Sequence, residues 1–96
     1  MHSVKQLKSD FDSYLRGEGP SVVELAPAPL LDEWNVVISD YCGDYQLYLS
    51  GEVSGHPSID NGHCSTSAVV WLDPKERWAR TTSRVYQLGK RAETAE

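Results

Sequence analysis

Residues 33–55, EWNVVISDYCGDYQLYLSGEVSG, decide the fold class, because the pattern of the chain changes here from helical to extended. The first part, EWNVVIS, is rich in β-branched side chains, which favour strands. DYCGD then supplies a turn, and the following stretch alternates, with Tyr45, Leu47 and Leu49 on one face. We expect Gly51 to mark a bulge that bends this second strand.

Before this stretch the spacing predicts an amphipathic helix over residues 3–16. Ser3 and Gln6 fit a capping box at its start. Apolar side chains then recur at helical spacing, as Val4, Leu7, Phe11, Tyr14 and Leu15. Residues 17–33 form a proline-rich connector, in which SVVEL is expected to form a short strand and the prolines prevent a regular helix.

After this stretch the pattern predicts further short strands. HPSIDNGH is a loop with a tight Asn61-Gly62 turn, SAVVWLD is a strand, and RWARTTSRVYQLG is one or two strands. Residues 34–89 therefore form a β-meander, and residues 90–96 form a frayed polar tail. The whole chain, residues 1–96, is predicted to be one α+β domain. Its N-terminal helix precedes a small, strongly bent antiparallel sheet or an SH3-like barrel of four to five strands.

The length and composition limit the classes of function. A chain of 96 residues forms one domain with a modest core, so a large active-site cleft is hard to build. No apolar run approaches the roughly 20 residues that span a bilayer, and the N-terminus lacks the apolar segment of a secretion signal. We therefore expect a cytoplasmic protein with reduced thiols.

The charge is unevenly distributed along the chain, with a net value of −5. Residues 1–73 carry three basic and eleven acidic side chains, whereas residues 74–96 carry six basic and three acidic ones. The acidic part disfavours nonspecific contact with nucleic acid phosphates. The basic segment is still able to make a local contact.

Four side chains, Cys42, His56, His63 and Cys64, are of the types that bind zinc. Their spacing is poor for a structural site, since adjacent His63 and Cys64 point awkwardly for one metal. A zinc-stabilised domain therefore stays a minor alternative, in which chelation would unfold the protein. Cys64 lacks the setting that activates a nucleophile, and no phosphate-binding loop is present, so we expect no enzyme activity and no cofactor.

Basic and aromatic side chains interleave near the C-terminus. They are Lys75, Arg77, Trp78, Arg80, Arg84 and Tyr86. Exposed on one strand face, such side chains would bind single-stranded nucleic acid or another protein. The alternative is that Trp78 belongs to the core and that the arginines pair with acidic side chains.

The segments LSGEVSGHP, TSAVVWLD and WARTTSRVYQLG resemble a group of small bacterial proteins of unknown function. The resemblance runs from about Leu49 to Gly89 and carries no catalytic residue. It implies one structural or binding unit made of His56, Pro57, Thr66, Ser67, Arg80, Thr81, Arg84 and Tyr86.

We hypothesise that a curled sheet brings His56, Thr66, Ser67, Arg80 and Arg84 into one polar network, which either stabilises the fold or binds an anion. The leading interpretation of the chain is a non-enzymatic protein-interaction or regulatory module, of the adaptor or inhibitor type. Its expected partner is another protein, with a homodimer through an open strand edge as a further option. A nucleic-acid-binding module, using the basic and aromatic C-terminal strands, is the alternative.

Overall fold

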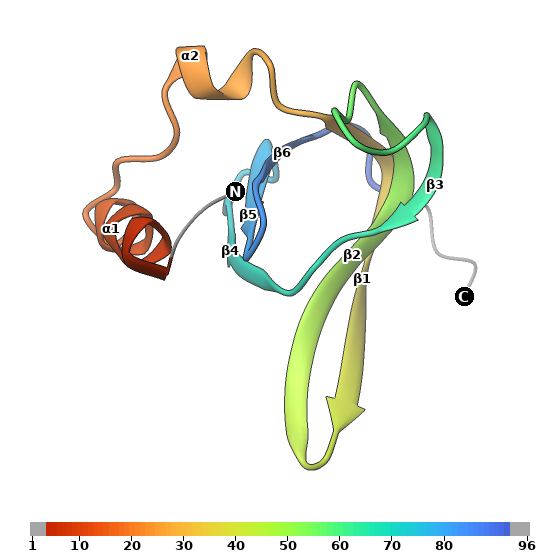
Figure 1. Cartoon of the computed structure of the whole chain (residues 1–96), viewed down its shortest axis with the longest axis horizontal. Coiled ribbons are helices and arrows are strands. Elements are labelled where there is room, and N and C mark those ends of the chain that lie inside the picture. The colour runs from red at the N-terminus through yellow and green to blue at the C-terminus, as the bar shows by residue number, and fades with distance from the viewer. Residues whose placement is uncertain (1–3, 93–96) are drawn as a thin grey trace.

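The computed structural model describes residues 4–92, with only the backbone of Tyr41. Within these residues, two helices precede six strands (Figure 1). Their bounds are α1 Val4–Leu15, α2 Val22–Leu25, β1 Leu30–Tyr41, β2 Asp44–Ser54, β3 Gly62–Ser65, β4 Val69–Leu72, β5 Trp78–Thr81 and β6 Val85–Leu88. The α+β class and the N-terminal helix are confirmed, while the predicted cap at Ser3 lies outside the described residues.

All six strands belong to one mixed sheet with the order β3-β2-β1-β6-β5-β4. The prediction of an antiparallel sheet of four to five strands was wrong in two respects. A short strand, β3, lies where the polar composition indicated only a loop, and it pairs with β2. The chain is also not a simple meander, because β1 and β6 are parallel.

The parallel pairing forms because the end of the proline-rich connector is itself extended. Strand β1 begins at Leu30, four residues before the predicted start at Trp34. The backbone N–H of Gln87 donates to the carbonyl of Pro29 at 2.8 Å, and that of Gly89 donates to the carbonyl of Leu31 at 2.9 Å. Proline lacks an N–H but keeps its carbonyl, so it is tolerated here as an acceptor.

The connector contains a helical turn, α2, where a short strand was predicted. Ser21 caps this turn, since its hydroxyl accepts a hydrogen bond from the N–H of Glu24 at 3.2 Å. The Glu24 carboxylate accepts in return from the N–H of Ser21 at 3.3 Å. This reciprocal pair is the Ser-x-x-Glu capping box, which favours a helix start even when valines follow.

The bulge lies on β1, whereas the sequence predicted it at Gly51 on β2. The register shifts between Asp32 and Asn35, and Glu33 has a positive φ of 50°. Gly51 faces the bulge instead. A Cβ at this position would lie 2.7 Å from the Asp32 carbonyl oxygen and 3.0 Å from the Trp34 Cα, so only glycine lets the two strands approach this closely.

The sheet curls around the hydrophobic core, and edge strand β4 contacts β2. The core contains Leu31, Trp34, Leu49, Val53, Cys64, Ala79, Tyr86 and Leu88. Helix α1 packs on this body through aromatic contacts, with the Tyr14 ring centroid 4.9 Å from that of Trp78. Tyr14 is the buried member of the predicted apolar stripe, while Val4 and Leu15 at the helix ends are exposed.

The polar tail is not frayed as far as Ala92. Its backbone runs beside the bulge of β1, where the N–H of Ala92 donates to the Trp34 carbonyl at 2.8 Å. The Trp34 indole N–H donates to the carbonyl of Gly89 at 3.1 Å. Trp34 is almost completely buried, so these bonds satisfy polar groups that would otherwise destabilise the core.

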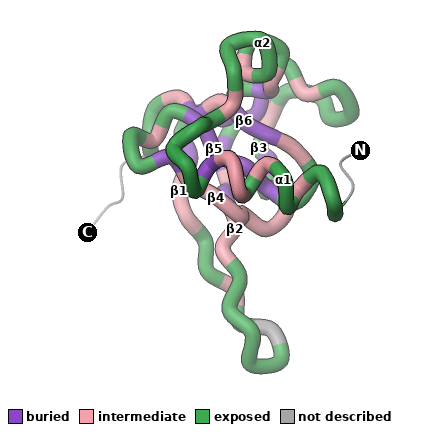
Figure 2. Tube along the Cα trace, turned by 90° about the vertical axis from the view of Figure 1, so that its left-hand side faces the viewer, coloured by how far each residue is buried: buried purple, intermediate pink, exposed green. Residues whose placement is uncertain are grey.

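Strands β1 and β2 are much longer than their other neighbours. Strand β3 pairs with residues 50–53 of β2, and β6 pairs with residues 30–31 of β1. The remainder of the hairpin, residues 36–48, is called the ribbon below. The ribbon projects from the body, and most of its length is exposed (Figure 2).

Candidate interaction sites

The structure does not place the predicted basic and aromatic residues on one exposed face. Trp78, Arg80 and Tyr86 are buried, because β5 and β6 are two paired strands that both contribute to the interior. The Arg77 side chain is exposed but donates to the Asp73 carboxylate at 2.9 Å. Of this set, Lys75, Arg77 and Arg84 therefore present a charged group at the surface.

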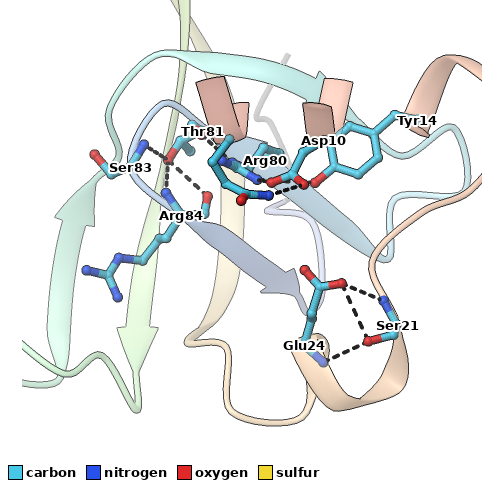
Figure 3. A network of polar contacts seen from close by, with 9 residues as sticks. Asp10, Tyr14, Ser21, Glu24, Arg80, Thr81, Ser83 and Arg84 are labelled. Carbon is cyan, nitrogen blue, oxygen red and sulfur yellow. Dashed lines mark hydrogen bonds and ion pairs between the residues drawn. The ribbon is translucent and has the colours of Figure 1, made fainter. Parts of the chain in front are cut away.

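Arg80 is fully buried and connects the sheet to α1 (Figure 3). Its Nη1 donates to the Asp10 carboxylate and, at 3.4 Å, to the Tyr14 hydroxyl. Its Nε donates to the carbonyl of Thr81 at 2.9 Å. A buried charge has to be paired and hydrogen-bonded, so these contacts identify Arg80 as a structural tether between helix and sheet.

Burial also changes the pKa of Tyr14, which accepts a hydrogen bond from Arg80 in this tether. Burial raises the pKa of the Tyr14 phenol, and it outweighs the hydrogen bond and positive charge of Arg80, which act in the opposite direction. Tyr14 therefore stays neutral near pH 7 and accepts the hydrogen bond from Arg80. Within residues 4–92, the Nη2 of Arg80 is a buried side-chain donor without a hydrogen-bond acceptor.

The predicted hydroxyl residues, Thr66 and Ser67, lie on the segment between β3 and β4. Thr66 Oγ1 accepts from the Leu49 N–H at 3.1 Å and donates to the Ser67 carbonyl at 2.8 Å. The Ser67 hydroxyl donates to that of Ser83 at 3.0 Å. These bonds attach the segment between β3 and β4 to β2 and to the β5–β6 turn. The N–H groups of Ser83 and Arg84 both donate to Thr81 Oγ1, and the Thr81 carbonyl accepts from Arg80. Hydrogen bonds thus connect four of the five hypothesised residues through Ser83 and Thr81, whereas the His56 ring bonds to the N–H of Ser58.

Arg84 lines a cleft, and His56 lies in the chain between two other lining residues, Gly55 and Pro57. The cleft has a volume of about 420 Å³ and is called the Arg84 cleft below. Its lining residues are Glu24, Pro27, Ala28, Pro29, Gly55, Pro57, Arg84 and Val85. The His56 ring lies beside that of Tyr86, with 6.1 Å between centroids. Burial, and then the charge of Arg84, lower the pKa of His56.

The four predicted zinc-ligand types are not gathered. Cys42 is exposed at the turn of the hairpin, and Cys64 is buried in the core, each as a free thiol. His63 is exposed beside Glu52, with 3.4 Å between its Nδ1 and the carboxylate. Over residues 4–92, no three His, Cys, Asp or Glu side chains lie close enough together to hold a metal ion.

The ribbon carries an apolar stripe that sequence reasoning did not recognise as exposed. Ile38 pairs with Leu47, and Asp40 pairs with Tyr45, so the predicted common face of Tyr45, Leu47 and Leu49 is confirmed. Leu49 is fully buried, whereas 68% of Ile38 and 76% of Tyr45 are exposed. The core-facing side of the hairpin therefore continues into solvent as an apolar surface.

The length of β1 and β2 is the feature that indicates a projecting ribbon. The two strands of the hairpin contain 12 and 11 residues, while the other four strands contain four residues each. Four-residue neighbours cannot cover strands of this length. The distal part of the hairpin then has free edges on both sides and projects from the body.

These features define a class of protein: a small α+β domain with a curled mixed sheet, a projecting hairpin and a cleft beside a proline-rich connector. The chain belongs to a family described as a family of unknown function (DUF6634), whose model matches residues 8–96. The expected small family of unknown function is thereby confirmed, and the match also includes most of the helix and the connector. No curated protein and no solved structure matches the chain. The part of the chain that the structure describes contains no helix long and apolar enough to cross a membrane.

Proposed function

We propose that this chain is a non-enzymatic protein-interaction module that binds a partner protein through the ribbon. The exposed apolar stripe of the ribbon is the observation that carries the proposal. A two-stranded ribbon is marginally stable by itself in water, and exposed large apolar side chains are unfavourable there. A partner that covers Ile38 and Tyr45 would remove both disadvantages.

The charge of the hairpin favours a partner of opposite charge. Residues 30–54 contain five acidic side chains and no lysine or arginine. Two of them, Asp40 and Asp44, flank the turn of the ribbon. A homodimer through this element would bring like charges together, so we propose an apolar groove with a basic rim on a different protein. The proposed compartment is the cytoplasm, where the two cysteines would stay reduced.

The test is an affinity capture from the source cells with the full chain as bait, in the presence and absence of nuclease. The bait is compared with the double variant Ile38→Ser/Tyr45→Ser. A matched control, Val22→Ser/Val23→Ser, removes two equally exposed apolar side chains from α2. We expect one protein to be captured by the original chain and by the control, and to be lost with the ribbon variant.

The captured protein is then purified and its affinity for each variant is measured by calorimetry. Truncation of an aromatic anchor costs about 2 kcal/mol or more, which is roughly a thirtyfold loss of affinity. Equal binding of the ribbon variant would overturn the proposal. Capture of nucleic acid that disappears at high salt would instead support the nucleic-acid alternative.

A further inference from the structure

The Arg84 cleft is a second surface feature, distinct from the ribbon. It lies between the segment after α2, the loop after β2 and the start of β6. Three of its lining residues are prolines, Pro27, Pro29 and Pro57. Prolines give rigid apolar walls, and the volume of about 420 Å³ is within the range of small-molecule pockets.

Arg84 differs from the other arginines of the chain. Arg16, Arg77, Arg80 and Arg91 each form an ion pair with a carboxylate. Between residues 4 and 92, Arg84 has no ion-pair partner and its guanidinium makes no hydrogen bond. Figure 3 shows its side chain directed away from the hydrogen bonds that surround its backbone. An unpaired guanidinium beside an apolar cleft is available to an anionic ligand.

The backbone at Arg84 is firmly positioned by Thr81, which is fully buried. The Arg84 N–H donates to Thr81 Oγ1 at 3.2 Å, and the Arg84 carbonyl accepts from the Thr81 N–H at 2.9 Å. The Thr81 hydroxyl also donates to this carbonyl at 3.1 Å. The side chain of Arg84 therefore extends from a fixed base, which lowers the entropy lost on binding.

His56 adds a second hydrogen-bond donor near Arg84. Its Nδ1 accepts the N–H of Ser58 at 3.0 Å, so the neutral ring carries its proton on Nε2. Burial and the positive charge of Arg84 favour this neutral form. The ring follows Gly55 and precedes Pro57, which both line the cleft, so it would add a donor close to an anion bound by Arg84 without a second full positive charge.

We propose that the Arg84 cleft binds a small organic carboxylate whose apolar body lies against the prolines. The planar guanidinium of Arg84 matches a carboxylate in a two-pronged contact. Glu24 also lines the cleft, and its negative charge disfavours a dianion such as a phosphate monoester. One guanidinium and one neutral imidazole are sufficient for a monoanion.

This inference goes beyond the proposed function, because the cleft and the ribbon are separate. The α2 segment that borders the cleft and the turn of the hairpin lie at opposite ends of the molecule in both views (Figures 1 and 2). Loss of partner binding through the ribbon would leave the cleft intact. Loss of carboxylate binding in the cleft would likewise leave the ribbon intact. Either proposal can therefore fail while the other one holds.

The experiment titrates hexanoate into the isotope-labelled full chain and follows backbone amide shifts by NMR at pH 7.5. We expect saturable shifts at Arg84, His56 and Ala28, with weaker binding of hexanamide and of hexyl phosphate, each by roughly tenfold or more. Hexanamide keeps the apolar body without the charge, and hexyl phosphate replaces the monoanion by a phosphate monoester.

Variants then assign the binding to Arg84. Arg84→Gln should weaken hexanoate binding by roughly tenfold or more, and Arg84→Lys should weaken it less, since lysine keeps the charge but not the planar fork. The matched control Arg16→Gln removes an exposed arginine elsewhere and should change nothing. Equal binding of hexanamide, tighter binding of hexyl phosphate, no saturable shifts, or unchanged binding by Arg84→Gln would each overturn the proposal. If Arg84→Gln does not fold, Arg84→Lys decides by the same criterion.

Discussion

Removal of the Asp10 carboxylate is expected to destabilise this fold strongly. Asp10→Ala would leave the guanidinium of Arg80 charged, fully buried and without its ion-pair partner. Breaking one side of a buried pair costs about 3–5 kcal/mol. The Asp10 side chain is 19% exposed, so water can partly replace it, and the lower end of this range applies here.

The magnitude is large relative to the stability of a small domain. At about 3 kcal/mol, with each kcal/mol shifting the melting temperature of such a domain by about 4–8 °C, we expect Tm to fall by at least about 12 °C. Asp12→Ala is the matched control. Asp12 lies on the same helix and pairs with Lys8 in an exposed ion pair of 3.4 Å, which contributes about 0–1 kcal/mol.

Thermal and urea unfolding of the two variants measures the difference. Both substitutions change the helix propensity by the same amount, so this contribution cancels between them. A second variant, Asp10→Ala/Arg80→Met, removes the unpaired charge as well and should recover part of the loss. Equal melting temperatures for Asp10→Ala and Asp12→Ala would refute the assignment of Arg80 as a tether.

Three further outcomes follow from the structure. Burial alone would raise the pKa of the Asp73 carboxyl, but hydrogen bonds from Arg77 and Lys75 outweigh burial and lower that pKa. The ionised carboxylate therefore stabilises the fold at pH values above the pKa of the unfolded state. This stabilisation is lost as the pH falls through the lower pKa of the folded state. Asp73→Asn should therefore lower the free energy of unfolding at pH 7 by about 1–3 kcal/mol in urea titrations and make it less dependent on acid pH, and a parallel pH dependence would contradict this. The pKa of His56, followed by NMR, should lie below 6.5 and rise in Arg84→Gln, whereas an unchanged value would separate the two side chains. Gly51→Ala should destabilise the fold by about 1–3 kcal/mol in thermal unfolding, because its Cβ would overlap the bulge of β1, and a neutral effect would show that the bulge can move.

The helix and the central hairpin could be predicted because their patterns are local. Spacing of three and four residues specifies α1, and alternation specifies the shared face of Tyr45, Leu47 and Leu49. The parallel β1–β6 pair could not be predicted from such patterns. It depends on the carbonyl of Pro29 reaching the Gln87 N–H across the chain, a contact that no local periodicity encodes.

The candidate sites likewise depend on contacts between distant parts of the chain, which local patterns do not reveal. An interleaved run of arginines and aromatics has the same sequence pattern whether it faces solvent or the core. Arg80 is buried because Asp10, seventy residues away, supplies its counter-charge, while Arg84, four positions later, has no ion-pair partner among residues 4–92. The Ser21–Glu24 capping box, in contrast, was legible in the sequence and outweighs the strand preference of the two valines that it encloses.

The two proposed sites can be tested because neither is needed for the fold. Ile38 and Tyr45 are mostly exposed, so their replacement by serine removes little buried surface and should leave the free energy of unfolding almost unchanged. The backbone of Arg84 is held by Thr81, so its side chain can change while the β5–β6 turn persists. A loss of binding in these variants then reports on the surface itself. The same loss in an Arg80 or Trp78 variant would report on the folded state, because those side chains are part of the interior.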